Sequence, residues 1–208
     1  MAEKVRTVDK ESWEPRSKVG RKVKEGEITT FEEIVEMGKP VFEPEIIDVL
    51  LPNLEAETLK INTTQRVTDS GKRIKFRVVT VIGDRKGHVG LGVGKSDELK
   101  PALDYAVKDA KKNMTSIRMG CGSWECKCDF KHSLTSKTQG KEGSTTVTLK
   151  PAPRGLGLAG NDVVKKVLGI SGVRDIWSSC HGGKNVYNMA AATINALDNI
   201  NLRKPRPE

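Results

Sequence analysis

The middle of the chain carries two segments whose composition and alternation are typical of β-strands. From Ile74 to Ile82 most residues are β-branched, and every second side chain falls on one face of an extended backbone. Lys60–Thr68 also has the composition of a strand, and Asp69-Ser70-Gly71 between the two favours a tight turn. The pattern therefore predicts a β-hairpin over residues 60–82.

A third strand is predicted at 88–94, and one of its faces has no side chains. Apolar residues alternate with glycines along it: Val89, Gly90, Leu91, Gly92, Val93 and Gly94. The following Lys95-Ser96 is similar to the end of a phosphate-binding P-loop. That motif requires glycine where Val89 stands, and the dinucleotide-binding pattern G-x-G-x-x-G requires glycine where Lys95 stands. We therefore expect no nucleotide site, and we expect another element of the same unit to pack closely on the bare face.

A long amphipathic helix is predicted after this strand. Ser96 is assigned as its N-cap, and Asp97 and Glu98 occupy the first turn, where the helix dipole favours acidic residues. The apolar residues have helical spacing: Leu99, Ala102, Leu103, Ala106, Val107, Ala110 and Met114. The predicted order of this unit is β-β-β-α.

The C-terminal part predicts a second unit with the order β-α-β-α. Its elements are a strand at Ser144–Lys150, a helix at Asp162–Leu168, a strand at Val173–Ser179 and a helix at Asn185–Ile200. The Pro- and Gly-rich stretch 151–160, PAPRGLGLAG, is a loop between the first two. Trp177 lies in an apolar strand and is assigned to the core. Trp13 and Trp124 have polar neighbours and are candidate interface anchors.

The N-terminal region is irregular at first and then helical. Residues 15–24, PRSKVGRKVK, contain five basic and no acidic residues, and we interpret them as an extended arm that orders on RNA or as a solvated tail. Thr30 and Glu33 form a capping-box pattern that predicts a short helix over Phe31–Met37. Pro44 opens a second short apolar element, EIIDVLL.

The charge of the chain is large and unevenly distributed. The 208 residues carry a formal net charge of +9. Residues 1–26 hold eight basic against five acidic residues, residues 27–59 hold one against nine, and residues 60–208 hold 27 against 13. The basic majority indicates a nucleic acid or an anionic surface as partner, and the acidic block is expected to face solvent or a basic protein.

Composition also argues against several classes of protein. The first residues, MAEKVRTVDKESW, are too charged for a secretory signal, and no apolar run approaches the length of a transmembrane helix. No catalytic arrangement stands out, because the acidic pairs occupy predicted helix starts. We therefore expect a cytoplasmic protein that is not an enzyme, with no membrane partner and no small-molecule substrate.

Several long motifs resemble one protein family. The stretch GDRKGHVGLGVGKSDELKPALDYAVKDAKKNM, the loop PAPRGLGLAG, the following KKVLGISGVRDIW and the terminal NMAAATINAL have the order found in the small-subunit ribosomal protein S-five family. The segments EPEIIDVLLP and CGSWECKC are similar to its archaeal type. The resemblance implies an α+β fold. A double-stranded-RNA-binding-domain-like β-β-β-α unit precedes a small α/β two-layer sandwich with the order β-α-β-α.

Together these observations divide the chain into five parts. We predict an N-terminal extension with a basic arm and an acidic helical segment (1–53), the double-stranded-RNA-binding-like domain (54–118), a cysteine-rich connecting loop (119–143), the C-terminal α/β domain (144–200) and a tail (201–208).

The resemblance implies a function as well as a fold. It implies a structural constituent of the small ribosomal subunit that binds small-subunit ribosomal RNA where the body meets the head, beside ribosomal proteins S-four and S-eight. It also implies a place near the side where mRNA enters and an influence on translational accuracy. Two other functions are weighed against it, a free-standing double-stranded-RNA-binding regulator and a phosphate-handling enzyme that uses GVGKS.

Basic residues on turns are the candidate RNA contacts, because phosphate contacts need side chains that reach past the apolar core. The hairpin turn presents Lys72 and Arg73, and the resemblance places the matching loop near ribosomal RNA of the head. The other candidates lie on the second turn, before the predicted helix and in two C-terminal loops: Arg85, Lys86, Lys95, Arg154 and Lys184.

A short segment concentrates metal-binding residue types. Three of the four cysteines and one of the three histidines fall within twelve residues: Cys121, Cys126, Cys128 and His132. Three thiolates and one imidazole suit a closed, tetrahedral structural zinc site. The spacing C-x4-C-x-C-x3-H lacks the usual C-x2-C, so free reduced thiols and a disulfide stay open as alternatives. His132 has an alternative as an RNA contact, and Cys180 an alternative as fourth ligand.

Overall fold

The computed structural model describes residues 3–4, 13–126, 128 and 130–201, so all but the first residue of the predicted tail (201–208) lies outside them. The chain forms two compact units. The first comprises residues 1–82 and 90–114, and the second comprises residues 83–89 and 115–208. The turn at 83–89 therefore belongs with the C-terminal part, although it joins two strands of the first sheet.

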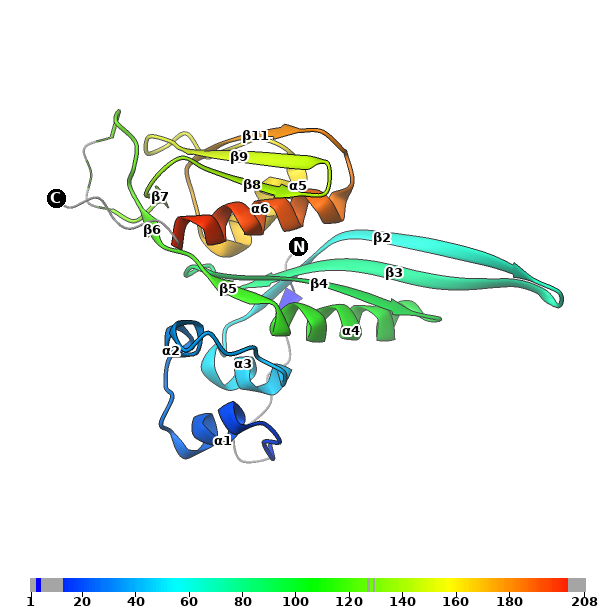
Figure 1. Ribbon diagram of the computed structural model, residues 1–208. Coiled ribbons are helices and arrows are strands. Elements are labelled where there is room, and N and C mark those ends of the chain that lie inside the picture. Colours follow the sequence, from blue (N-terminus) through cyan, green and yellow to red (C-terminus); the bar gives the residue numbers. More distant parts are fainter. Residues whose placement is uncertain (1–2, 5–12, 127, 129, 202–208) are drawn as a thin grey trace. The chain divides into compact units, whose positions relative to one another are not determined.

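The first sheet has five strands in the described part of the chain, in the order β1-β2-β3-β4-β5. They are β1 (Glu3–Lys4), β2 (Glu55–Thr68), β3 (Gly71–Gly83), β4 (His88–Ser96) and β5 (Met114–Ser116). The helix α4 (Leu99–Lys112) follows β4, which confirms the predicted β-β-β-α order. The β2–β3 hairpin is longer than predicted, and its tip extends beyond β4 and α4 (Figure 1). Nearly every residue from 60 to 75 is exposed.

The bare face of β4 packs directly on the backbone of α4, as expected from the glycine pattern. A Cβ atom placed on Gly90 would lie 2.4 Å from the carbonyl oxygen of Ala110, and one on Gly92 would lie 2.1 Å from that of Ala106. On Gly94 it would lie 1.9 Å from the carbonyl oxygen of Ala102. The three alanines are fully buried. The close approach therefore depends on small residues on both elements.

The start of α4 differs from the prediction. Its N-cap is Glu98, not Ser96, and no side-chain hydrogen bond caps it. Ser96 is the last residue of β4, because strand pairing continues two residues beyond the glycine run. Lys95 is consequently a strand residue that does not adjoin the helix N-terminus.

From residue 13 to β2 the chain contains three helices, where the sequence indicated one arm and two short elements. They are α1 (Lys18–Glu25), α2 (Phe31–Glu36) and α3 (Pro44–Leu50). The interpretation of residues 15–24 as an extended arm is wrong, because residues from Lys18 onward form α1, which buries Val19 and Val23. Ser17 caps α1 by accepting the N–H of Gly20 at 3.0 Å. In α2, Thr30 donates to the Glu33 carboxylate at 2.8 Å and does not cap the backbone as the capping box predicted.

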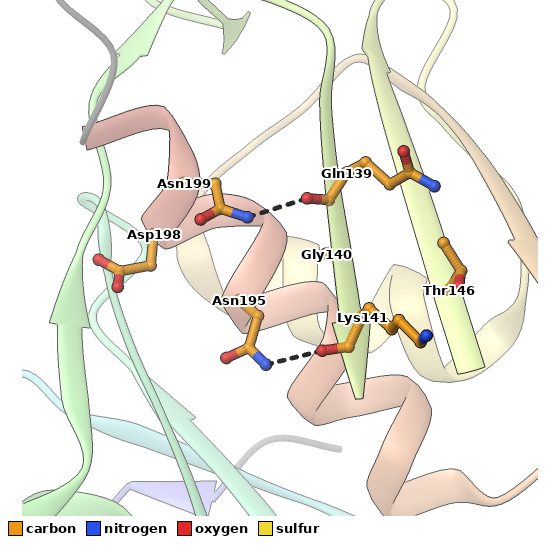
Figure 2. A pocket seen from close by; sticks show the side chains of 7 residues that line it. All are labelled: Gln139, Gly140, Lys141, Thr146, Asn195, Asp198 and Asn199. Carbon is orange, nitrogen blue, oxygen red and sulfur yellow. Dashed lines mark hydrogen bonds between the residues drawn. The ribbon is translucent and has the colours of Figure 1, made fainter. Parts of the chain in front are cut away.

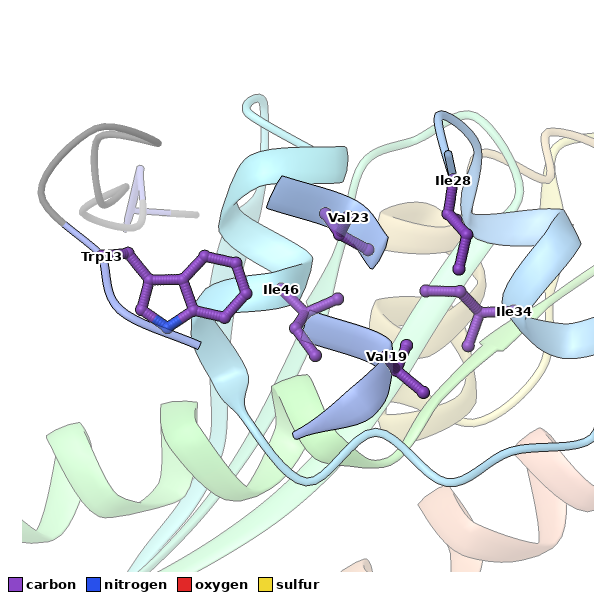
Figure 3. Close-up of a cluster of buried hydrophobic side chains, with 6 residues drawn as sticks. All are labelled: Trp13, Val19, Val23, Ile28, Ile34 and Ile46. Carbon is purple, nitrogen blue, oxygen red and sulfur yellow. The ribbon is translucent and has the colours of Figure 1, made fainter. Parts of the chain in front are cut away.

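Trp13 is also placed differently from the prediction. It is 7% exposed and belongs to a core cluster with Val19, Val23, Ile28, Ile34 and Ile46. Figure 3 shows Val19 and Val23 on α1, Ile34 on α2 and Ile46 on α3. Trp13 comes from the segment before α1, and Ile28 from the connection between α1 and α2. Trp13 is therefore a core residue of the N-terminal helices and not an interface anchor.

A buried ion pair attaches the acidic segment to α4. The Lys111 Nζ lies 2.5 Å from Asp48 Oδ1, and both side chains are almost fully buried. Burial raises the pKa of Asp48, and the neighbouring Lys111 ammonium opposes that rise. Phe31, Ile47 and Leu54 form a hydrophobic cluster with residues of β3 and of α4, the helix that carries Lys111. Asp48 of the acidic block therefore has its charge partner inside this unit and does not face solvent, unlike the expectation for the block as a whole.

The second unit is a two-layer α/β sandwich, as predicted. Its sheet has the order β10-β11-β9-β8, formed by β8 (Thr138–Glu142), β9 (Thr145–Pro151), β10 (Leu158–Ala159) and β11 (Ile176–His181). The helices α5 (Asp162–Ser171) and α6 (Val186–Asn201) pack on one face of it (Figure 1). The assignment of Trp177 to the core is wrong: it is 48% exposed, because Ile176 and not Trp177 points toward the helices.

The edge strand β8 was not predicted, and side chains of α6 hold its outer backbone. Asn195 donates to the carbonyl of Lys141 at 3.2 Å, and Asn199 donates to that of Gln139 at 2.9 Å. Figure 2 shows both bonds spanning a polar groove between the two elements. Between them, a Cβ on Gly140 would lie 2.2 Å from the carbonyl oxygen of Ala192. Unpaired edge carbonyls are thereby satisfied within the chain.

The turn between β3 and β4 is organised around Asp84. One carboxylate oxygen accepts the N–H groups of Lys86 and His88 at 2.8 and 3.1 Å, and the other lies 2.7 Å from the His88 ring. Burial alone would raise the pKa of Asp84, but these hydrogen bonds outweigh burial and lower it below 3.8. The N–H groups of Arg85 and Gly87 reach the carbonyls of Ile170 and Ser171 at the end of α5.

The Asp84 carboxylate should make stability depend on acid. Because its folded pKa is lowered, its stabilisation is complete above 3.8 and is lost as pH falls through the folded value. Asp84→Asn should lower the free energy of unfolding by about 2 kcal/mol at pH 7, since charge-assisted hydrogen bonds are lost. Urea unfolding between pH 7 and pH 3 should show this difference shrinking in acid. The exposed Asp97→Asn should change little, and a difference for Asp84→Asn that stays constant with pH would contradict the assignment.

Candidate metal site and nucleic-acid interface

The four residues of the cysteine-rich segment converge on one point. The Sγ atoms of Cys121, Cys126 and Cys128 and one ring nitrogen of His132 all lie within 4.8 Å of one another. The Cys126–Cys128 and Cys121–Cys128 sulfur pairs are 3.1 and 3.5 Å apart, and His132 Nε2 is 3.3 Å from Cys128 Sγ and 3.8 Å from Cys126 Sγ. Ligands of a tetrahedral zinc ion are roughly 3.5–3.8 Å apart, given Zn–S and Zn–N bonds of about 2.0–2.3 Å. The spacing therefore suits zinc.

Local pairing explains why these residues meet. The short strands β6 (Met119–Gly120) and β7 (Ser133–Leu134) pair antiparallel, so that Gly120 faces Ser133. Cys121 and His132 follow and precede these strands, and pairing brings them to the same end. The cluster therefore lies on the loop 121–132, whose two ends are already held together by the pairing of β6 with β7. Cys180 lies on β11 and outside the group, so the alternative of Cys180 as fourth ligand is not supported.

The thiols of the cluster are electrostatically unequal. The pKa of Cys126 is lowered to about 7. The main cause is its hydrogen bond with the Cys128 thiol, and the second is the hydrogen bond from the backbone N–H of Arg154. The same interaction with Cys126 raises the pKa of Cys128 to about 11. A thiolate is the form that binds metal, and the lowered pKa of Cys126 favours that form. A dication would be needed to hold all three sulfurs deprotonated together.

A buried hydrogen-bond network surrounds His132. Its side chain is 6% exposed, and its Nδ1 lies 2.8 Å from Oδ2 of Asp175. The backbone N–H groups of Arg174 and Asp175 both donate to the His132 carbonyl. With Nδ1 bound to the carboxylate, Nε2 is the nitrogen that faces the sulfur atoms. Asp175 was not identified from the sequence, because it is 43 residues from His132 and no local motif marks it.

The candidate RNA contacts are all exposed, and they are divided between the two units. Lys72 and Arg73 lie at the start of β3 beside the hairpin tip, and Lys95 lies near the end of β4. In the second unit the exposed candidates are on the turn 83–89, on the Pro/Gly loop and before α6: Arg85, Lys86, Arg154 and Lys184.

Arg154 has structural partners that the sequence did not indicate. Its guanidinium lies over the ring of Phe130, 5.2 Å from the centroid, and its backbone N–H donates to Cys126 Sγ. Phe130 is 66% exposed and Trp124 is 89% exposed. The prediction that Trp124 is available as an anchor therefore remains a prediction, whereas Arg154 is tied to the cysteine-rich segment.

Comparison with known proteins decides the family. Residues 54–118 match the family described as ribosomal protein S5, N-terminal domain, and residues 140–206 match ribosomal protein S5, C-terminal domain. The chain is 45% identical over 195 residues to the small ribosomal subunit protein uS5 of Methanocaldococcus jannaschii, covering 93% of this chain and 90% of that protein. The chain belongs to the ribosomal protein S5 family.

Further relatives agree on the same family. The chain is 47% identical to uS5 of Methanospirillum hungatei over 93% of its own length and 95% of that protein. It is 47% identical to uS5 of Pyrobaculum islandicum, over 92% and 96%. These organisms supply relatives of the predicted archaeal type. The S5 family consists of structural, non-enzymatic proteins, which confirms that the chain is not an enzyme. In the described residues, no helix is long and apolar enough to cross a membrane.

Proposed function

We propose that this protein is a structural constituent of the small ribosomal subunit, located in the cytoplasm within the ribosome, and that it binds small-subunit ribosomal RNA. The observation that carries the proposal is the match to both S5 domains in a chain of net charge +9. The residues proposed to contact phosphate are the exposed basic residues on turns: Lys72, Arg73, Arg85, Lys86, Lys95, Arg154 and Lys184. Their exposure agrees with contacts that position the protein on an RNA backbone.

The proposal extends to the place of the protein in the subunit. The family resemblance supports a position where the body meets the head, near the side where mRNA enters, with ribosomal proteins S-four and S-eight as neighbours and an influence on translational accuracy. We further propose the division of the chain at residues 53, 118, 143 and 200. Limited proteolysis of the isolated protein would test that division, since linkers are cleaved before folded domains.

The hairpin turn gives the sharpest test of RNA binding. Lys72→Ala with Arg73→Ala should reduce co-sedimentation with small subunits and lower the salt slope of ribosomal RNA affinity by about two, because two phosphate contacts are lost. Both residues are exposed, so the fold should be unchanged. Sucrose-gradient sedimentation and RNA affinity measured against salt provide the readouts.

The matched control removes the same charge elsewhere in the same unit. Lys100→Ala with Lys108→Ala changes two exposed positions of α4 and should retain binding. Equal loss in both double variants would make the effect one of net charge and reject the turn as a contact. Wild-type protein that stays in the ribosome-free fraction would overturn the ribosomal function and favour a free-standing regulator.

We also propose that Cys121, Cys126, Cys128 and His132 bind one structural zinc ion. The single observation that supports this is the convergence of three sulfurs and one imidazole nitrogen at tetrahedral spacing. All four positions of a tetrahedral ion are filled by protein ligands, which is typical of a structural and not a catalytic site. Elemental analysis of purified full-length protein should find about one zinc per chain, and a metal-free, folded protein would reject the site.

A further inference from the structure

A single carboxylate joins the proposed metal site to the loop that carries Arg154. Asp175 is 5% exposed and uses both of its oxygens. Oδ2 lies 2.8 Å from Nδ1 of His132, whereas Oδ1 accepts the N–H groups of Gly155 at 3.0 Å and Gly157 at 2.8 Å. Its backbone carbonyl also accepts the hydroxyl of Ser133, the residue after His132. Asp175 is therefore the common partner of two segments that are distant in the sequence.

The loop makes a second, independent contact with the cluster. The backbone N–H of Arg154 donates to Cys126 Sγ, and the Arg154 guanidinium lies over Phe130 of the cysteine-rich segment. The N–H of Arg154 thus points at the proposed ligand Cys126. The N–H groups of Gly155 and Gly157 point at Asp175, whose carboxylate holds the proposed ligand His132. Gly155 and Gly157 have φ of +93° and +76°, a conformation that other residues rarely adopt and that turns these N–H groups inward.

We propose that Asp175 is a positioning residue that couples metal binding to the conformation of residues 153–157. The inference rests on the proposed zinc site. In this arrangement Asp175 holds the ring of His132 with Nε2 toward the metal, and the same carboxylate fixes the loop through Gly155 and Gly157. Binding of the metal therefore sets how Arg154 is presented to a phosphate.

The physical basis is the hydrogen bond that orients a metal-binding histidine. A carboxylate that accepts from Nδ1–H fixes the tautomer in which Nε2 has a free lone pair, and it raises the basicity of that nitrogen. A bound dication draws electron density from the ring, which strengthens the Nδ1–H···Oδ2 bond in return. It also fixes the position of Cys126 Sγ, the atom that accepts the Arg154 N–H. Without metal both contacts weaken together, and the loop loses two of its anchors.

The wild-type protein provides the first arm of the test. Hydrogen exchange of the full-length chain is measured with one equivalent of zinc and after removal of zinc by a chelator. Chelation should increase exchange of the amides of residues 154, 155 and 157 by at least about tenfold, since their acceptors become mobile. Amides of β9 should stay protected and control for unfolding of the unit. Unchanged exchange in 153–157 after complete zinc removal would overturn the coupling.

Asp175→Asn provides the second arm. The amide can still accept from the glycines, but its NH2 group faces His132 Nδ1, which then has to act as acceptor and place its proton on Nε2. Zinc affinity, measured by competition with a chromogenic chelator, should fall about 10- to 100-fold. The cobalt-substituted protein should lose its thiolate-to-metal absorption at lower chelator concentrations. Asp162→Asn, at an exposed position of α5, should match wild type.

The outcomes separate this inference from the zinc site on which it rests. Wild-type protein that binds no zinc would reject the site and the coupling together. Wild-type protein that binds zinc, with an Asp175→Asn variant of equal affinity and folded by circular dichroism, would reject only the coupling. The chelation arm does not depend on whether the variant folds.

Discussion

Gly92→Val should prevent stable folding of the first unit. The new Cβ would lie 2.1 Å from the carbonyl oxygen of Ala106 and 2.2 Å from the N atom of Ala110, and both atoms belong to the helix backbone. A clash with a neighbouring side chain could be relieved by rotation of that side chain. Backbone atoms cannot move in this way, so the whole of α4 would have to shift away from the sheet. We expect a loss of about 4 kcal/mol or more in the free energy of unfolding, at the upper end for overpacking. Thermal melts and urea unfolding of the full-length protein measure it.

Intrinsic strand propensity predicts the opposite result, because valine is preferred over glycine in strands. Thr63→Val is the matched control: it introduces a valine on β2 at an exposed position, and its stability should stay within about 0.5 kcal/mol of wild type. If Gly92→Val melts at or above the wild-type temperature while RNA binding persists, the close approach of α4 is not what requires glycine here.

Cys126→Ser with Cys128→Ser should abolish zinc binding and make the protein insensitive to chelators. Two of the four proposed ligands are lost, and the remaining sulfur and imidazole cannot close a tetrahedral site. Structural zinc contributes folding free energy directly, on the order of 10 kcal/mol in small zinc domains. Elemental analysis should therefore fall from about one zinc per chain to none. The melting temperature of wild type should drop on chelation to that of the double variant.

Cys180→Ser is the control for a general effect of removing thiols. Burial raises the pKa of Cys180, and it lies on β11 outside the cluster, so the variant should keep its zinc and its response to chelators. Metal retained by the double variant would show that other residues bind it. A wild-type melting temperature that is unaffected by complete zinc removal would contradict a structural role.

The elements that the sequence predicted well are those whose periodicity reports directly on burial. The hairpin, the glycine-faced strand and α4 each repeat at the spacing of a strand or a helix, and one of their core clusters, Val78 with Ala102 and Ala106, lies within the same stretch of chain. By contrast, α1 has only Val19 and Val23 as apolar residues at helical spacing. A helix of eight residues is not stable alone, so its conformation depends on Trp13 and on α3, which a local pattern does not report.

Two further differences between the sequence-based prediction and the structure, at Trp177 and at β8, have similar causes. Trp177 occupies a strand with one buried face, and an assignment one residue out of register places it on the wrong side. The strand β8 has no apolar alternation, because its core contact is Gly140 and its outer edge is held by asparagines of α6. Apart from its pairing with β9, its hydrogen-bond partners on α6 lie more than 50 residues away in the sequence. The domain boundaries inferred from the sequence remain a prediction.

The candidate site was predictable only in its local part. Cys121, Cys126, Cys128 and His132 are clustered within twelve residues, and residue type alone indicates metal chemistry. Asp175 and Arg154 join that cluster through the fold of the second unit, and nothing in their sequence neighbours distinguishes them from other polar loop residues. The candidate RNA contacts were chosen from turn positions. Their exposure agrees with that choice, and their contacts remain a proposal.

The contact between β4 and α4 also limits how the length of this region can change. Alternate strand residues are about 6.6 Å apart, and every fourth helix residue is about 6.0 Å apart, so Gly90, Gly92 and Gly94 step almost in phase with Ala110, Ala106 and Ala102. The two repeats stay nearly in register over these three contacts, which span two steps, and drift apart beyond them. One inserted residue in either element would place a side chain where the partner has a carbonyl. Insertions and deletions are therefore tolerated only in the connection at 97–98 and beyond the ends of this matched stretch.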